Sequence, residues 1–184
     1  MIVALWTAVA LAAAVAIAAL ALGLLLARRY RELHSAVSQR PAAATPAYHL
    51  PPVGAAVSEF RTATTGGEPL TSDDLNGDDV TVAVLMVGCT PCTEEVPALR
   101  EAFAAVPAGA DRPVAVIVSE SAGAGPAMYV AELGPVARVV VEEPGGEVST
   151  ALGVSGYPAV LVVGRGHILQ AGTRVADIAV PVAA

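Results

Sequence analysis

Residues 80–106 read VTVAVLMVGCTPCTEEVPALREAFAAV, and this stretch decides the fold. The continuous apolar, valine-rich run Val80–Val87 is typical of a strand that is buried on both faces of a sheet. Thr93–Val106 is compatible with a helix, in which Pro97 is expected to kink or offset the first turn. The sequence therefore predicts a strand, then a tight turn that carries Cys89 and Cys92, and then a helix.

The two cysteines of this turn are the only ones in the chain. A disulfide-stabilised secreted fold spreads several cysteines along its sequence, so this pair is interpreted as functional. Cys89 is expected at the exposed start of the helix, where unpaired N–H groups and the positive end of the helix dipole favour an anion. That position is expected to lower the pKa of the Cys89 thiol and make it the attacking nucleophile. Cys92 lies one helical turn further on and is placed to close a disulfide with it.

The charge balance excludes one class of function. Lys is absent, and from Pro41 onward 6 Arg stand against 16 Asp and Glu, which gives a formal charge of −10. A nucleic-acid surface needs a basic patch, so no nucleic-acid partner is expected. The sequence also has no phosphate-loop pattern and no complete dinucleotide fingerprint. The protein is expected to be a monomer.

The N-terminal region divides into two predicted segments. Met1–Ala27 has no charged side chain and is long enough to cross a bilayer, whose core needs roughly 20 apolar residues. A cleaved signal peptide is the competing interpretation, but its basic start and shorter apolar region are missing here. Residues 28–52 are predicted to be an Arg-rich stalk followed by a Pro/Ala linker, because proline favours extended backbone.

Residues 53–184 are predicted to form one α/β domain. Strands are expected at 57–65, 80–87, 114–118, 137–141, 159–163 and 167–171. Residues 71–79 are expected to form a short helical turn or a loop. Helices or helical turns are expected at 93–106, 127–133 and 147–152, and one short helix is expected before Pro181 in the tail 174–184. Strands that alternate with helices and end in a hairpin predict a mixed central sheet flanked by helices on both faces.

Three motifs together resemble the thioredoxin superfamily, and most closely its membrane-anchored TlpA-like redoxins. Cys89–Pro97 is similar to the Cys-x-Pro-Cys-x-x-Glu-x-Pro of that branch, and Glu143–Val148 and Leu152–Pro158 resemble its later landmarks. The layout of anchor, stalk and spacer is more loosely similar to the MauD-like accessory proteins of methylamine utilisation. One departure is Gly88, since the family usually has a Trp there that shields the disulfide and contributes to substrate binding.

The resemblance implies a role for several residues. Pro158 would be the cis-proline of a loop that faces the two sulfurs, and Tyr157 before it would contact the substrate backbone. Thr90 and Pro91, between the cysteines, would contact substrate and tune the redox potential. Glu95 would accept a proton from the second cysteine if it is buried; a solvent-facing helix glutamate is the alternative. No metal and no cofactor beyond the redox-active disulfide is expected.

The predicted activity is protein thiol–disulfide exchange. Cys89 attacks a client disulfide, and Cys92 then attacks Cys89 to release the reduced client, or the same steps run in reverse. The expected partners are client proteins and an upstream redox donor or acceptor. A peroxiredoxin-like peroxidase is one alternative, although the threonine expected three positions before Cys92 is replaced by Cys89. A non-enzymatic copper module that uses Cys89, Cys92 and His167 is the other.

The sequence gives two opposing indications of the side of the membrane. Arg28, Arg29 and Arg31 directly follow the apolar segment, and the positive-inside rule then favours a cytoplasmic domain. The family resemblance, together with a dedicated anchor, favours delivery of redox equivalents to exported proteins. The prediction is a single-pass membrane protein with its domain on the extracytoplasmic face.

Overall fold

The computed structural model describes residues 49–77, 79–106, 112–120 and 125–180, all of which lie in one compact unit, Pro46–Ala184. The predicted anchor Met1–Ala27 and the Arg-rich stalk fall outside these ranges. None of the helices formed by the described residues combines the length and the apolar character that a bilayer crossing requires.

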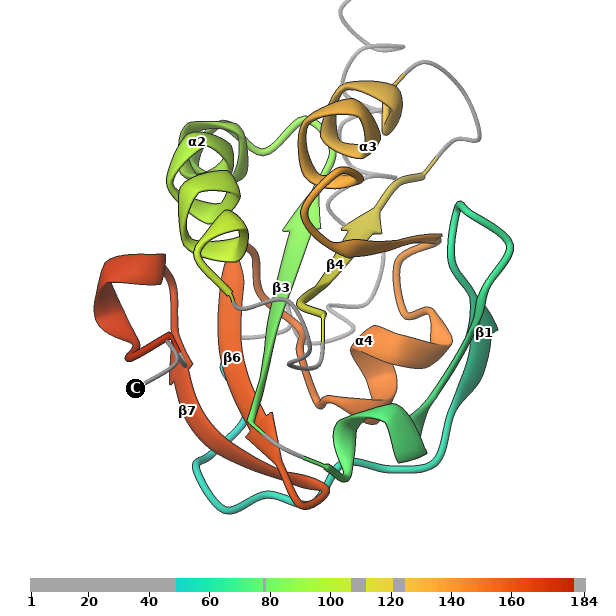
Figure 1. Ribbon diagram of the computed structural model, residues 1–184, viewed down its shortest axis with the longest axis vertical. Helices are drawn as coiled ribbons and strands as arrows, with labels where there is room; N and C mark the ends of the chain where they lie inside the picture. The colour runs from blue at the N-terminus through green and yellow to red at the C-terminus, as the bar shows by residue number, and fades with distance from the viewer. Residues whose placement is uncertain (1–48, 78, 107–111, 121–124, 181–184) are drawn as a thin grey trace, which may run out of the picture. The chain divides into compact units, whose positions relative to one another are not determined.

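A five-stranded mixed sheet forms the centre of the domain, in the order β5-β4-β3-β6-β7 (Figure 1). Its central strand β3 pairs in parallel with β4 and antiparallel with β6. Parallel pairing continues from β4 to β5, and antiparallel pairing from β6 to β7. The strands are β3 (Val80–Met86), β4 (Val114–Val118), β5 (Arg138–Glu142), β6 (Ala159–Gly164) and β7 (His167–Gly172). The mixed sheet confirms the prediction.

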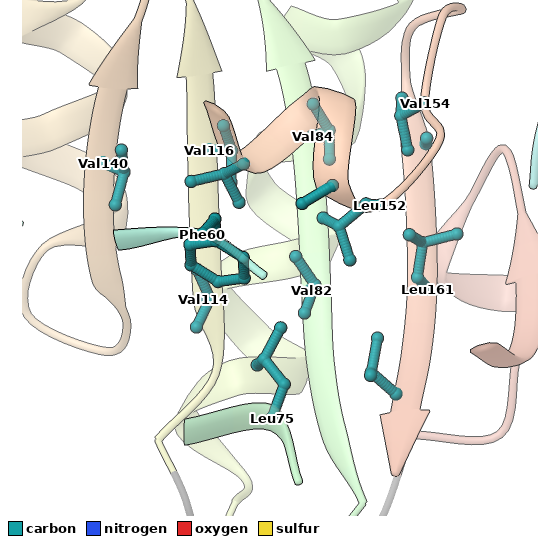
Figure 2. Close-up of a cluster of buried hydrophobic side chains, with 14 of the residues drawn as sticks. Phe60, Leu75, Val82, Val84, Val114, Val116, Val140, Leu152, Val154 and Leu161 are labelled. Carbon is teal, nitrogen blue, oxygen red and sulfur yellow. The ribbon is translucent and has the colours of Figure 1, made fainter. Parts of the chain in front are cut away.

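Helices cover both faces of the sheet, also as predicted. Alternate residues of β3 point to opposite faces, so Val82 and Val84 pack in one core cluster while Ala83 and Leu85 pack in the other. The first cluster includes residues of α4 (Glu147–Ala151) and is drawn in Figure 2. The second includes residues of α2 (Thr90–Ala104) and α3 (Ala127–Leu133). This two-sided burial explains why β3 reads as a continuous apolar run.

The helix α2 begins at Thr90, three residues earlier than predicted. Cys89 is its N-cap, and the Cys89 sulfur accepts a hydrogen bond from the backbone N–H of Cys92. Pro91 lies in the first helical turn, where a missing N–H removes no intrahelical hydrogen bond. Pro97, expected to kink or offset the first turn, lies inside this single helix.

The strand predicted at 57–65 is shorter in the structure and is not part of the central sheet. Only β1 (Arg61–Ala63) is a strand, and it pairs with β2 (Pro69–Thr71) in a separate two-stranded sheet. The pairing changes because Phe60, just before β1, turns its side chain into the core cluster shown in Figure 2. A 3-10 turn, η1 (Ser72–Leu75), follows where a short helical turn or loop was expected.

The segment before β1 is packed against the sheet. Gly54 donates its N–H to Ile168 of β7, and Val57 donates its N–H to Gly166. Pro51 is buried, and Leu50 packs against the core, so the end of the predicted linker contacts the domain. These contacts cover the β7 edge of the sheet near its start.

The predicted C-terminal helix is reduced to one 3-10 turn in the part of the tail that is described. This turn, η2 (Val175–Asp177), ends because Ile178 adopts an extended conformation and is largely buried in the core. The next residue, Ala179, donates its N–H to the side chain of Gln170 in β7. Residues 178–180 therefore lie beside β7 rather than continuing as a helix.

Candidate active site

The two cysteines of the predicted turn form a disulfide, with their Cα atoms 5.3 Å apart. Cys89 is half-buried at the start of α2, whereas Cys92 has no exposed surface. The Cys92 N–H lies 3.3 Å from the Cys89 sulfur, and the N–H of Met86 lies 3.5 Å from the Cys92 sulfur. The position of Cys89 at the helix start is thus as predicted. The difference in burial means that an incoming thiol reaches Cys89 first.

The loop before β6 faces the disulfide, as the resemblance implied. The peptide bond between Tyr157 and Pro158 is cis, and the carbonyl oxygen of Tyr157 lies 3.9 Å from the Cys89 sulfur. Pro158 is buried and Tyr157 is half-buried. Residues almost seventy positions apart in the sequence thereby form one site at the end of the sheet where β3 ends.

The side chain of Tyr157 lies near Ser149 of α4. Tyr157 packs against both core clusters. Burial raises its pKa above the ordinary value of 10.0, and the nearby charge of Glu142 raises it further, against a smaller opposing effect of a hydrogen bond with Ser149. The Glu142 carboxylate accepts hydrogen bonds from the N–H groups of Val148 and Ser149 and from the Ser149 hydroxyl. Tyr157 is therefore a neutral phenol at physiological pH, anchored beside the first turn of α4.

A buried tyrosine in α3 links the two ends of the cysteine turn, and the sequence analysis missed it. The hydroxyl of Tyr129 lies 2.9 Å from the Thr93 hydroxyl and 3.4 Å from the Met86 carbonyl oxygen, and its one proton can be donated to either. Thr93 in turn donates to the carbonyl of Cys89 at 3.3 Å. A tyrosine that faces the sheet from a short helix must find a partner for its hydroxyl, and this requirement is the signal that could have identified it.

Glu95 has a partner that neither sequence interpretation anticipated. It is half-buried, and its carboxylate accepts the N–H of Val175 at 2.7 Å, which ties α2 to η2. Within the described residues it makes no hydrogen bond to either cysteine. Its predicted role as a proton acceptor remains a prediction.

A groove of about 320 Å³ opens beside the disulfide. Its lining combines the cysteine turn, the cis-proline loop and the segment after β7: Pro91, Glu94, Glu95, Tyr157, Pro158, Thr173 and Arg174. Two of the predicted substrate-contacting residues, Pro91 and Tyr157, thus share one concave surface. Thr90 is exposed at the helix start but does not line this groove.

Gly88, directly before Cys89, is exposed and has open space where a side chain would begin. Its φ of +82° lies in the left-handed region that favours glycine, and a Cβ added there would meet no atom within 4 Å. Because position 88 is a glycine, no side chain at this position shields the disulfide.

The copper alternative is not supported by the positions of its three ligands. His167 begins β7 opposite Gly164, at the end of the sheet where β3 begins, whereas the cysteines follow the other end of β3. Across the described ranges, no three His, Cys, Asp or Glu side chains gather closely enough to hold a metal ion. Cys89, Cys92 and His167 therefore form no common site.

Several solved structures share the fold of this chain. The thioredoxin domain of a thiol-disulfide oxidoreductase from Bacteroides vulgatus matches 69% of this chain and 92% of its own, with a TM-score of 0.54 and 20% identity. A thiol:disulfide interchange protein of the thioredoxin family from Chlorobium tepidum gives the same coverage and TM-score at 22% identity. A DsbF homologue from Corynebacterium diphtheriae matches 77% of this chain and 90% of its own, with a TM-score of 0.54 and 18% identity.

These likenesses show that the chain has the thioredoxin-like fold. No protein-family model and no curated protein matches the sequence.

Proposed function

We propose that the protein is a thiol–disulfide oxidoreductase that exchanges disulfides with client proteins through Cys89 and Cys92. The observation that carries the proposal is the asymmetric disulfide, in which Cys89 is reachable beside a groove while Cys92 is fully buried. The motif resemblance to TlpA-like redoxins supports it. So do the names of similarly folded proteins, which describe thiol–disulfide oxidoreductases and interchange proteins.

The exchange follows from the geometry of the two sulfurs. In the oxidised protein, a client thiolate attacks the Cys89 sulfur, the Cys89–Cys92 bond breaks, and Cys92 leaves as a thiolate that takes up a proton. A second client thiolate then attacks the client sulfur of the mixed disulfide, which forms the client disulfide and releases the Cys89 thiolate. Two electrons and two protons pass from the client to the cysteine pair, and the reverse sequence reduces a client disulfide.

Backbone N–H groups are placed to stabilise both leaving sulfurs. The Met86 N–H points at Cys92, and the Cys92 N–H points at Cys89. A thiolate at a helix start is further favoured by the helix dipole. These donors are fixed by the fold, so they need no rearrangement as charge develops.

A peroxidase with Cys92 as the attacking thiol fits the site less well. Cys92 has no exposed surface, whereas Cys89 is half-buried. Susceptibility to oxidation follows exposure, so peroxide is expected to reach the Cys89 sulfur before that of Cys92.

The exchange reaction is tested by trapping the mixed disulfide. Cys92→Ser is expected to accumulate a mixed disulfide with an oxidised client, because the Cys89 thiolate breaks the client disulfide and no resolving sulfur then releases the adduct, whereas Cys89→Ser is expected to form none. Insulin reduction should be lost in both variants. Peroxide turnover that survives Cys89→Ser but not Cys92→Ser would replace this proposal by the peroxidase.

The proposed setting is the extracytoplasmic face of a membrane, with Met1–Ala27 as a single-pass anchor. The uncharged composition of that segment and the redox character of the site support it. Labelling of intact cells with an impermeant maleimide, after reduction, tests the side. Cysteines that react only after lysis would place the domain in the cytoplasm.

A further inference from the structure

We propose that the groove beside the disulfide selects client segments that carry positive charge next to their reactive cysteine. This inference rests on the proposed exchange function and adds the chemical class of the client. It is carried by the position of the groove and by the charges that line it.

The groove lies next to the reacting sulfur. Its lining includes Pro91, which lies between the two cysteines, and Tyr157, whose carbonyl oxygen lies 3.9 Å from the Cys89 sulfur. A client cysteine that forms a mixed disulfide with Cys89 can therefore place its neighbouring residues in or beside this groove.

Two carboxylates of the lining have no cation to neutralise them. Glu94 is exposed and forms no hydrogen bond or ion pair within the described residues, and Glu95 binds only the uncharged N–H of Val175. A neutral donor positions a carboxylate without cancelling its charge.

The single cation in the lining is already paired. The Arg174 guanidinium lies 3.3 Å from the Asp177 carboxylate, which also accepts the Arg174 N–H at 3.1 Å. Because Asp177 offsets Arg174, the groove keeps the negative charge of Glu94 and Glu95. The excess of acidic over basic residues across the domain has the same sign.

A concave surface of one sign attracts opposite charge and raises the rate of encounter. Such clefts increase association rates by roughly 10-fold or more at low ionic strength, and the effect falls with salt. A client segment with Arg or Lys beside its cysteine should therefore react faster than a neutral segment, and an acidic segment more slowly.

The test uses three matched disulfides and the reduced full-length protein in a neutral detergent. Each disulfide is a symmetric dimer of an acetylated and amidated tripeptide with cysteine in the centre and Arg, Gln or Glu on both sides. Second-order rate constants are measured at low and at high ionic strength. Each is divided by the rate of the same dimer with 2-mercaptoethanol, which removes differences in intrinsic disulfide reactivity.

The expected order is Arg over Gln over Glu, with an Arg-to-Glu ratio of about 10 or more at low salt that shrinks at high salt. Glu94→Gln should lower the ratio several-fold. Glu68→Gln makes the same change in net charge at an exposed position in the turn between β1 and β2 and should leave the ratio unchanged.

Equal normalised rates for the three dimers would overturn the inference while leaving the exchange function intact. An equal fall of the ratio in both variants would also overturn it, because overall charge rather than the groove would then explain the preference. A protein that reacts with none of the dimers overturns the exchange function, and this inference with it.

Discussion

Tyr129→Phe removes one hydroxyl from the network that joins the end of β3 to the first turn of α2. The tyrosine is buried, and its hydroxyl contacts the Thr93 hydroxyl at 2.9 Å and the Met86 carbonyl at 3.4 Å. Phenylalanine keeps the ring and its packing. The change therefore tests the hydrogen bonds alone.

The cost follows from what each partner retains. The Met86 carbonyl still accepts the N–H of Cys89 at 3.3 Å, and the Thr93 hydroxyl still donates to the Cys89 carbonyl at 3.3 Å. No buried partner loses its last hydrogen bond, so the larger penalty for an unsatisfied group does not apply. The Tyr129 hydroxyl has one proton, so one hydrogen bond is lost in net terms, and the free energy of unfolding should fall by about 1 kcal/mol.

Urea unfolding followed by circular dichroism measures this difference as a lower midpoint with an unchanged m-value. Thr93→Val should act through the same contact, so the double variant should lose less than the sum of the two single variants. Strict additivity, or a Tyr129→Phe protein as stable as the parent, would show that the network does not hold the cysteine turn in place.

Three further changes test other parts of the structure. Gly88→Ala should lower the unfolding free energy by roughly 1 kcal/mol in urea, because φ is +82° there and no new contact compensates the strain. Phe103→Ala should lower it by about 3–5 kcal/mol, because the ring is only 2% exposed in the core between α2 and the sheet. Burial opposes ionisation of Asp74, but hydrogen bonds from Thr71 and Arg138 outweigh it and lower its pKa below 3.8. The stability that this carboxylate contributes is present above pH 3.8 and is lost as the pH falls through the lower pKa of the folded state. The free energy of unfolding of Asp74→Asn, measured over the same acid range, should lack that loss.

The elements that the sequence predicted best are those whose signal is local. The residues of β4 and α3 coincide with the prediction, because a run of β-branched residues and a short apolar helix pattern are complete within a few positions. The limits of β1 and of η2 were missed, because each is set by a side chain that turns into a distant core, Phe60 in one case and Ile178 in the other.

The site was predicted in part for a related reason. The cysteine pair and the cis-proline were readable as motifs. The contact of Glu95 with Val175 joins residues 80 positions apart, and that of Tyr129 with Met86 joins residues 43 apart. The periodicity of apolar residues in the sequence does not predict such contacts, since they depend on how the helices pack on the sheet.

The meeting of the cysteine turn with the cis-proline loop depends on one strand pairing. β3 and β6 run antiparallel with Val84 opposite Ala159. The C-terminal end of β3 and the residues just before β6 therefore lie at the same end of the sheet. Cys89 then follows β3 by three residues, and Tyr157 precedes β6 by two. A slip of one residue in this register would move every side chain of β6 to the other face and carry the loop away from the sulfur. The buried apolar residues of β3 and β6 that alternate between the two cores therefore do more than stabilise the sheet, because they fix the register on which the 3.9 Å approach of Cys89 to Tyr157 depends.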